Sequence, residues 1–118
     1  MYGLPENTDL SFFTGKVLRQ VCTGVNEVIL HFDGDISLTI QTDIGHRLGD
    51  VFAALYKLPI PATPMLVRLL HCSIIRTGIK PPGTLILEFS NGEAIEIYDA
   101  CSEYESYQIT YNGKIIVV

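Results

Sequence analysis

The chain has 118 residues, of which 47% are hydrophobic and 18% charged, and its formal net charge at pH 7 is −5. Such an apolar composition excludes a disordered chain and allows one domain over residues 1–118 to bury a core. The eight Lys and Arg residues are spread along the chain. They form no concentrated basic surface, so we expect no nucleic-acid partner.

The first ten residues lack the basic and apolar regions of a signal peptide, and no apolar run approaches the ~20 residues of a membrane span. The three cysteines are an odd number without the spacing of a zinc or redox motif, which is typical of reduced thiols. We therefore expect a cytoplasmic protein with no membrane partner.

From Lys16 onward the pattern predicts an antiparallel β-meander. Side chains of alternating character from Val17 onward indicate a first strand, which ends at a turn over 24–26. Two further strands, 28–32 and 36–40, each have one apolar face and flank a loop at Asp33–Asp35. A two-residue loop would place these stripes on opposite faces of the sheet, because a slip of one residue turns every side chain over. We therefore predict a three-residue loop at 33–35, with Leu30 opposite Leu38.

The segment 44–68 interrupts the β pattern and is predicted to be a helical and proline-rich connector. Asp50 is a plausible N-cap for a helix over 51–58, where two alanines and two leucines favour helix. Pro59 and Pro61 then end that helix. Thr63-Pro64 is typical of the start of a second, short helix toward Leu70.

The second half of the chain repeats the first at an offset of 57 residues. Residues 12–43 align without a gap on 69–100, with five identities in 32 positions and a matching apolar rhythm. In this alignment Arg19 falls on Arg76, and Phe32 on Phe89. Two copies of one unit predict two antiparallel β-meanders related by a pseudo-twofold axis, in a mainly β (α+β) fold with one short helix between them. Phe32 and Phe89, and four further residues at matched positions, are expected to be buried: Leu30, Leu87, Ile40 and Ile97.

The same register argument places a second three-residue loop at 90–92, with Gly92 in the left-handed conformation. Asn112-Gly113 then predicts a C-terminal hairpin between 107–111 and 114–118. The run Ile115–Val118 is apolar on both strand faces. Such a strand needs cover or pairing with a second chain, so we expect a homodimer.

The sequence shows no clear motif for metal binding, nucleophilic catalysis or phosphate binding. The histidines and cysteines have no zinc-ligand spacing, and no nucleophile elbow or phosphate-binding glycine loop is present, so we expect no metal, no cofactor and no catalytic residues. Segment 98–107 combines three tyrosines with three carboxylates, a mixture favoured at protein interfaces. It is the candidate partner-binding surface, and the alternative is a solvated loop that covers the end of a sheet. The candidate residues are Tyr98, Asp99, Glu103, Tyr104, Glu105 and Tyr107.

Segment 98–107 and the runs before it also resemble a known group of sequences. The runs 85–92, 95–99 and 104–107 resemble an uncharacterised family of small bacterial proteins that carry an LxLxF-NG-xxIxI-D…YESY signature. The opening Leu4-Pro5, the run 9–12 and Gly15-Lys16 also fit the start of that family. Small, acidic, β-rich proteins of this kind are similar to immunity proteins, which bind and neutralise a toxin. The resemblance implies no catalytic residues.

Two hypotheses of function follow. The first is a non-enzymatic protein-binding module, an immunity-like inhibitor of a basic toxin. The alternative is a small ligand-binding or hydrolytic domain with a pocket between the two repeats.

Overall fold

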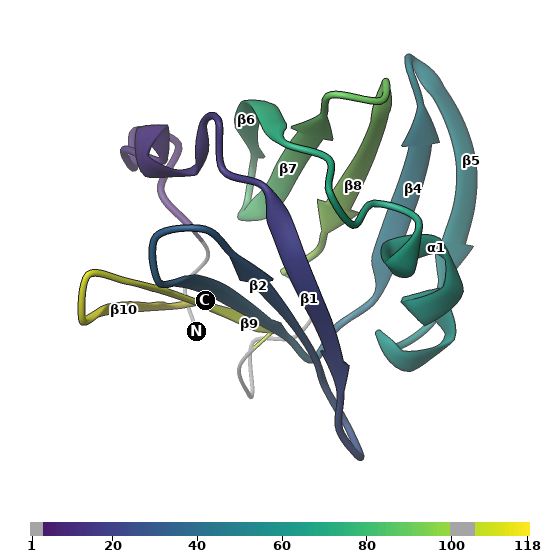
Figure 1. Cartoon of the computed structure of the whole chain (residues 1–118), viewed down its shortest axis with the longest axis horizontal. Helices are drawn as coiled ribbons and strands as arrows, with labels where there is room; N and C mark the ends of the chain where they lie inside the picture. Colours follow the sequence, from purple (N-terminus) through teal and green to yellow (C-terminus); the bar gives the residue numbers. More distant parts are fainter. Residues whose placement is uncertain (1–3, 100–105) are drawn as a thin grey trace.

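The structure, a computed structural model, describes residues 4–99 and 106–118. Ten strands form two antiparallel sheets of five strands each, shown in Figure 1. The first sheet contains, in spatial order, β1 (Leu18–Thr23), β2 (Val28–Phe32), β3 (Ile36–Ile40), β9 (Tyr107–Tyr111) and β10 (Lys114–Val117). The second contains β5 (Val51–Tyr56), β4 (Ile44–Leu48), β8 (Glu93–Ile97), β7 (Thr84–Phe89) and β6 (Ile74–Lys80). The connections hold one α-helix, α1 (Thr63–Val67), and two 3-10 helices, η1 (Ser11–Phe13) and η2 (Ile60–Ala62).

The predicted duplication is confirmed, because both halves have the same strand order. Strands β1-β2-β3 form one meander and β6-β7-β8 form the other. Each meander is followed in the chain by a hairpin, and that hairpin joins the sheet of the other half. Thus β4 pairs with β8, and β9 pairs with β3. The two halves have exchanged their hairpins, and each sheet contains strands from both.

The pseudo-twofold axis passes between Val17 and Ser73, which form an isolated antiparallel bridge. The hydrogen bonds around this bridge are themselves repeated. The Leu18 amide donates to the Cys72 carbonyl at 3.0 Å, and the Ile74 amide donates to the Lys16 carbonyl at 2.9 Å. The contact between the two halves is therefore made by equivalent residues.

The ungapped offset of 57 holds only for the middle of each repeat. Strands β1 and β6 begin at Leu18 and Ile74, 56 residues apart, whereas β4 and β9 begin at Ile44 and Tyr107, 63 apart. Both first strands have a bulge, at Arg19 and at Ile75. The predicted match of Arg19 with Arg76 is therefore wrong by one residue. The second half carries its extra residues between β8 and β9.

The predicted hairpin registers are confirmed. Leu30 lies opposite Leu38 and Leu87 lies opposite Ile95, as three-residue loops require. Gly92 has a φ of 89°, in the left-handed region. The C-terminal hairpin turns at Asn112-Gly113, where both residues have positive φ.

The predicted helix over 51–58 is wrong. Residues 51–56 form β5, which pairs with β4, and Asp50 lies in the turn between these two strands. The connector 44–68 therefore begins with a hairpin. The short helix predicted at Thr63-Pro64 is present as α1, which packs against β1 and buries Met65 and Leu66.

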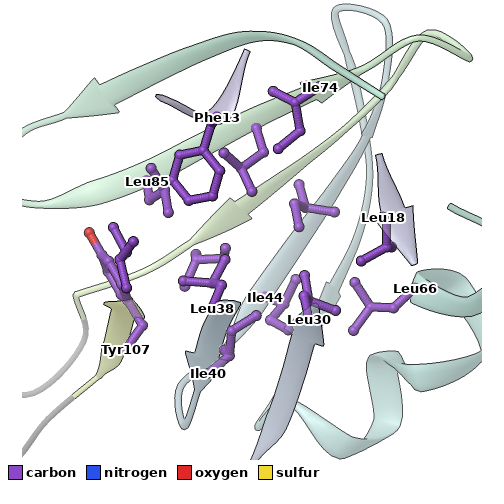
Figure 2. Packing of buried hydrophobic residues seen from close by; sticks show 14 of the residues in the cluster. Phe13, Leu18, Leu30, Leu38, Ile40, Ile44, Leu66, Ile74, Leu85 and Tyr107 are labelled. Atoms are coloured by element: carbon purple, nitrogen blue, oxygen red, sulfur yellow. The ribbon is translucent and has the colours of Figure 1, made fainter. Parts of the chain in front are cut away.

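One hydrophobic core fills the space between the two sheets, as Figure 2 shows. All six residues predicted as matched core positions are buried. Leu38 and Ile40 from the first sheet meet Ile44 and Leu85 from the second. Among the described residues no helix is long and apolar enough to cross a membrane.

Candidate functional site

The duplication provides an internal comparison for locating a functional surface. Most core-facing positions of the two halves are alike, but the outer faces of the two sheets differ. Three positions on the outer face of the second sheet carry Arg47, Glu96 and Tyr98, and their equivalents on the first sheet are Thr110, Thr39 and Gln41. The fold is therefore formed equally well with neutral residues there, and the charged and aromatic side chains need another explanation.

Glu96 is the centre of this charged face. Strand β8 holds it opposite Gly45 of β4, and the residue is only 5% exposed. The Arg47 Nε atom donates to Glu96 Oε2 at 2.6 Å, and the Tyr98 hydroxyl donates to Glu96 Oε1 at 3.0 Å. Each carboxylate oxygen thus has a hydrogen-bond donor, which is the condition under which a buried charge is tolerated.

Burial raises the pKa of Glu96, but the hydrogen bonds from Arg47 and Tyr98 outweigh it and leave the pKa below its ordinary value. The hydrogen bond to Glu96 and the Glu96 charge in turn raise the pKa of Arg47. Burial and the hydrogen bond to Glu96 raise the pKa of Tyr98 to about 12. At neutral pH the arrangement is therefore an ion pair with a neutral phenol hydrogen-bonded to it.

Gly45 lies beneath the Tyr98 ring. A Cβ atom at position 45 would collide with the Tyr98 hydroxyl and would lie 3.3 Å from the Phe52 ring. The Arg47 guanidinium carbon is 5.9 Å from the centroid of the same Phe52 ring, within the range of a cation–π contact. We call the surface formed by Arg47, Phe52, Glu96 and Tyr98 the Tyr98 face.

A groove of about 450 Å³ continues from the Tyr98 face across the sheet toward β6. The residues that line it on the β6 side include Arg76, Gly78, Lys80 and Glu88. Arg76 and Glu88 form an exposed ion pair at 3.4 Å. Basic and acidic side chains alternate along the groove, so it has no net preference for an anion or a cation.

The surroundings of Tyr98 are acidic. The Tyr98 amide donates to the Asp43 carbonyl at 3.4 Å, and the Asp43 carboxylate accepts the Leu58 amide at 2.9 Å. Asp99 follows directly in the chain and accepts the Ser106 hydroxyl at 3.4 Å. Arg47 is the nearest cation, and it is already paired with Glu96.

The structure places the predicted partner-binding residues in different environments. Tyr98 and Asp99 are half-buried at the surface, beside the acidic groups just described. Glu103, Tyr104 and Glu105 lie outside the described residues. Tyr107 belongs to the core: it lies opposite Ile40 in the pairing of β9 with β3 and is buried, and its hydroxyl donates to the Gly83 carbonyl at 2.7 Å. Its assignment to a binding surface is therefore wrong.

A second polar cluster lies at one corner of the core. His46 Nε2 is 2.6 Å from Glu93 Oε1, and His46 is only 4% exposed. Asn91 Nδ2 donates to Glu93 Oε2 at 2.6 Å, and Arg68 donates to Oε1 at 3.3 Å. The equivalent corner of the first half is apolar, with Ile109, Ile36 and Phe12 in place of His46, Glu93 and Arg68.

Sequence reasoning missed Arg47, Phe52 and Glu96. Strand β4, which carries Arg47, meets β8, which carries Glu96, only through the exchange of hairpins, and Phe52 was expected in a helix. A second alignment, of 44–52 on 107–115, would have indicated the hairpin, because it matches the turn at Gly49-Asp50 with Asn112-Gly113. Within residues 4–99 and 106–118, no group of three or more His, Cys, Asp or Glu is placed to hold a metal ion.

The chain matches no family model, no curated protein and no solved structure. Inference about its function therefore depends on the surfaces described above.

Proposed function

We propose that the protein is a non-enzymatic binding module of the cytoplasm, an immunity-like inhibitor that engages a basic partner protein through the Tyr98 face. The observation that carries this proposal is the difference between the two equivalent outer faces. One sheet presents threonines and glutamine, and the other presents Arg47, Phe52 and Tyr98 around a buried carboxylate. Tyrosine and arginine are the residue types that dominate the binding energy of protein interfaces.

The local charge supports a basic partner. Asp43 and Asp99 lie around Tyr98, and the charges of Arg47 and Glu96 cancel in their ion pair. The whole chain carries a formal charge of −5. A basic protein would therefore be attracted from solution toward this part of the surface, and the attraction would weaken as salt is added.

The ring of Tyr98 is held in place before any partner arrives. Its hydroxyl is fixed by Glu96 and its ring lies over Gly45, so little side-chain entropy remains to be lost on binding. Such a preorganised aromatic residue is the expected anchor of an interface. We infer that Tyr98 contributes the largest share of the binding energy, with Arg47 and Phe52 beside it.

The test is capture of a partner from the native host by immobilised protein, compared between wild type and Tyr98→Ala. Gln41→Ala is the matched control, because Gln41 occupies the equivalent position on the other sheet. We expect Tyr98→Ala to reduce affinity by about 30-fold, as for an interface hot spot, and Gln41→Ala to leave it unchanged. A captured protein that is basic and elutes with salt supports the proposal. Equal capture by both variants contradicts it.

A further inference from the structure

The edge strand β5 is unusually exposed and carries no charge. Val51 is 67% exposed and Phe52 is 48% exposed, and Leu55 and Ala53 are also at the surface. Natural proteins usually protect an edge strand with lysine, proline or a covering segment, because its free backbone groups can pair with another chain. The equivalent edge strand β10 follows this rule, since Lys114 stands where β5 has Val51. Strand β5 has neither lysine nor proline between Val51 and Tyr56.

A bulge distinguishes β5 from β10 as well. Ala53 is an extra residue between the pairs of Phe52 with Arg47 and of Ala54 with His46, whereas the β9–β10 hairpin has a regular register. Because of this extra residue, Phe52 and Leu55 both lie on the outer face, opposite Arg47 and Gly45. The fold does not need the bulge, as its twin hairpin shows.

We propose that β5 pairs in antiparallel fashion with β5 of a second copy of this chain, joining two five-stranded sheets into one of ten strands. The proposal goes beyond the proposed function, because the partner at β5 is a second copy of this acidic chain and not a basic protein. The reason is that the segment 50–57, Asp-Val-Phe-Ala-Ala-Leu-Tyr-Lys, is complementary to itself when reversed. A symmetric dimer interface must have this property.

The pairing follows residue by residue. With the dyad between Ala53 and Ala54, Phe52 lies opposite Leu55 of the second copy, and both belong to the outer face. Val51 lies opposite Tyr56 of the second copy, and both belong to the inner face. The bulge makes this register possible, because in a regular strand residues 52 and 55 would point to opposite faces.

The charges at the ends of the segment match too. Asp50 of one copy lies opposite Lys57 of the other, and the dyad produces this pair twice. Both side chains are exposed, and neither forms an ion pair within the described part of the chain. Cross-strand pairs of opposite charge stabilise a sheet, and like charges destabilise it. Two copies that each carry a charge of −5 therefore meet along an uncharged strand with two attractive ends.

The apolar surface that dimerisation would cover is modest. The exposed apolar side chains of Leu48, Val51, Phe52, Leu55 and Leu58 together offer on the order of 500 Å² per copy, so a dimer covers at most about 1,000 Å², at the lower limit of specific interfaces. We expect a reversible dimer with micromolar affinity. Since directly opposite residues share a face, both Tyr98 faces lie on the same side of the joined sheet.

The test is sedimentation equilibrium of the purified chain, which has a mass of 13.1 kDa. We expect wild type to approach twice that mass as concentration rises. Asp50→Lys alone and Lys57→Asp alone place like charges opposite each other, and each is expected to weaken association by about tenfold. The double variant Asp50→Lys/Lys57→Asp restores opposite pairs and is expected to recover the wild-type affinity. A loss of folding in either single variant would not be repaired in this way.

Ile115→Lys provides the matched control, because Ile115 is the equivalent of Phe52 on the other edge and is 60% exposed. It should leave the dimer intact, whereas Phe52→Lys should dissociate it. A monomer at all concentrations, or a double variant as weak as the singles, overturns the proposal. Partner capture that depends on Tyr98 but occurs with a monomeric chain would overturn this inference and leave the proposed function standing.

Discussion

Glu96 keeps a negative charge on a sheet face where the equivalent residue of the other half is a threonine. Its pKa is below the ordinary value because the donors Arg47 and Tyr98 outweigh the effect of burial. A carboxyl group whose pKa is lowered by folding contributes stability that is present above its unfolded pKa. That contribution is lost as pH falls through the folded pKa. The relevant window lies below the ordinary value of 4.5.

Replacing Glu96 with Gln removes the charge and is expected to lower the free energy of unfolding at pH 7 by about 1–2 kcal/mol, because a charge-assisted hydrogen bond is lost. The variant should also lose less stability than wild type between pH 5 and 3. Urea unfolding at these pH values measures both effects. Glu88→Gln is the control: its ion pair with Arg76 is exposed, and we expect a change within about 0.5 kcal/mol. Equal losses in the two variants would show that Glu96 is no more stabilised by its donors than a surface carboxylate.

Tyr107 shows which residues the sequence could place and which it could not. Alternation along 107–111 correctly indicated a strand, but the composition of segment 98–107 suggested a surface. The pairing of β9 with β3 puts Tyr107 beside Ile40 in the core. That pairing joins residues 67 positions apart, so nothing local in the sequence reveals it. The Tyr98 face was missed for the same reason, since its residues come together through β4 and β8.

At the scale of elements, the corner around His46 and Glu93 tests whether buried polar groups are required by the fold. In the other half the same corner is formed by isoleucines. Glu93→Ile alone leaves His46 and Arg68 without their partner, and we expect it to cost about 1–3 kcal/mol. The double variant His46→Ile/Glu93→Ile has the residues of the equivalent corner in the other half. It is expected to lower the free energy of unfolding by less than the single variant, since apolar replacement of a whole buried pair is often neutral.

A double-mutant cycle in chemical denaturant measures this, with His46→Ile and Glu93→Ile made singly and together. Additive losses would mean that the two side chains are not coupled. They would also mean that the close contact between His46 and Glu93 does not stabilise the corner.

The hairpins around 33–35 and 90–92 could be predicted because the strands that flank each loop pair in a regular register, and a register slip would bury polar residues. The hairpin β4–β5 could not, and the reason is the bulge at Ala53. It places Phe52 and Leu55 on one face at a spacing of three residues, which is the spacing of a helix. This spacing made Asp50 resemble the N-cap of a helix over 51–58, although Asp50 lies in the turn between β4 and β5. Pairing with β4 overrides the helix propensity of the alanines.

At the scale of the whole molecule, the exchange of hairpins means that neither half can complete its own sheet. The chain between Lys57 and Leu58 is exposed, so it can be divided there into fragments 1–57 and 58–118. We expect each fragment alone to lack the native circular dichroism of the intact chain, and an equimolar mixture to recover it. Native folding of either fragment as a monomer would contradict the exchanged arrangement.

The exchanged hairpins also affect how the protein is made. Strand β9 begins at Tyr107, 67 residues after β3 ends at Ile40. At about 5–20 residues per second, a ribosome needs roughly 3–13 s to add that stretch. During this time β3 has no neighbouring strand on the edge that β9 will occupy, and this edge can pair with other nascent chains. Translation order thus leaves β3 without its sheet neighbour for longer than β4, whose neighbour β8 begins at Glu93.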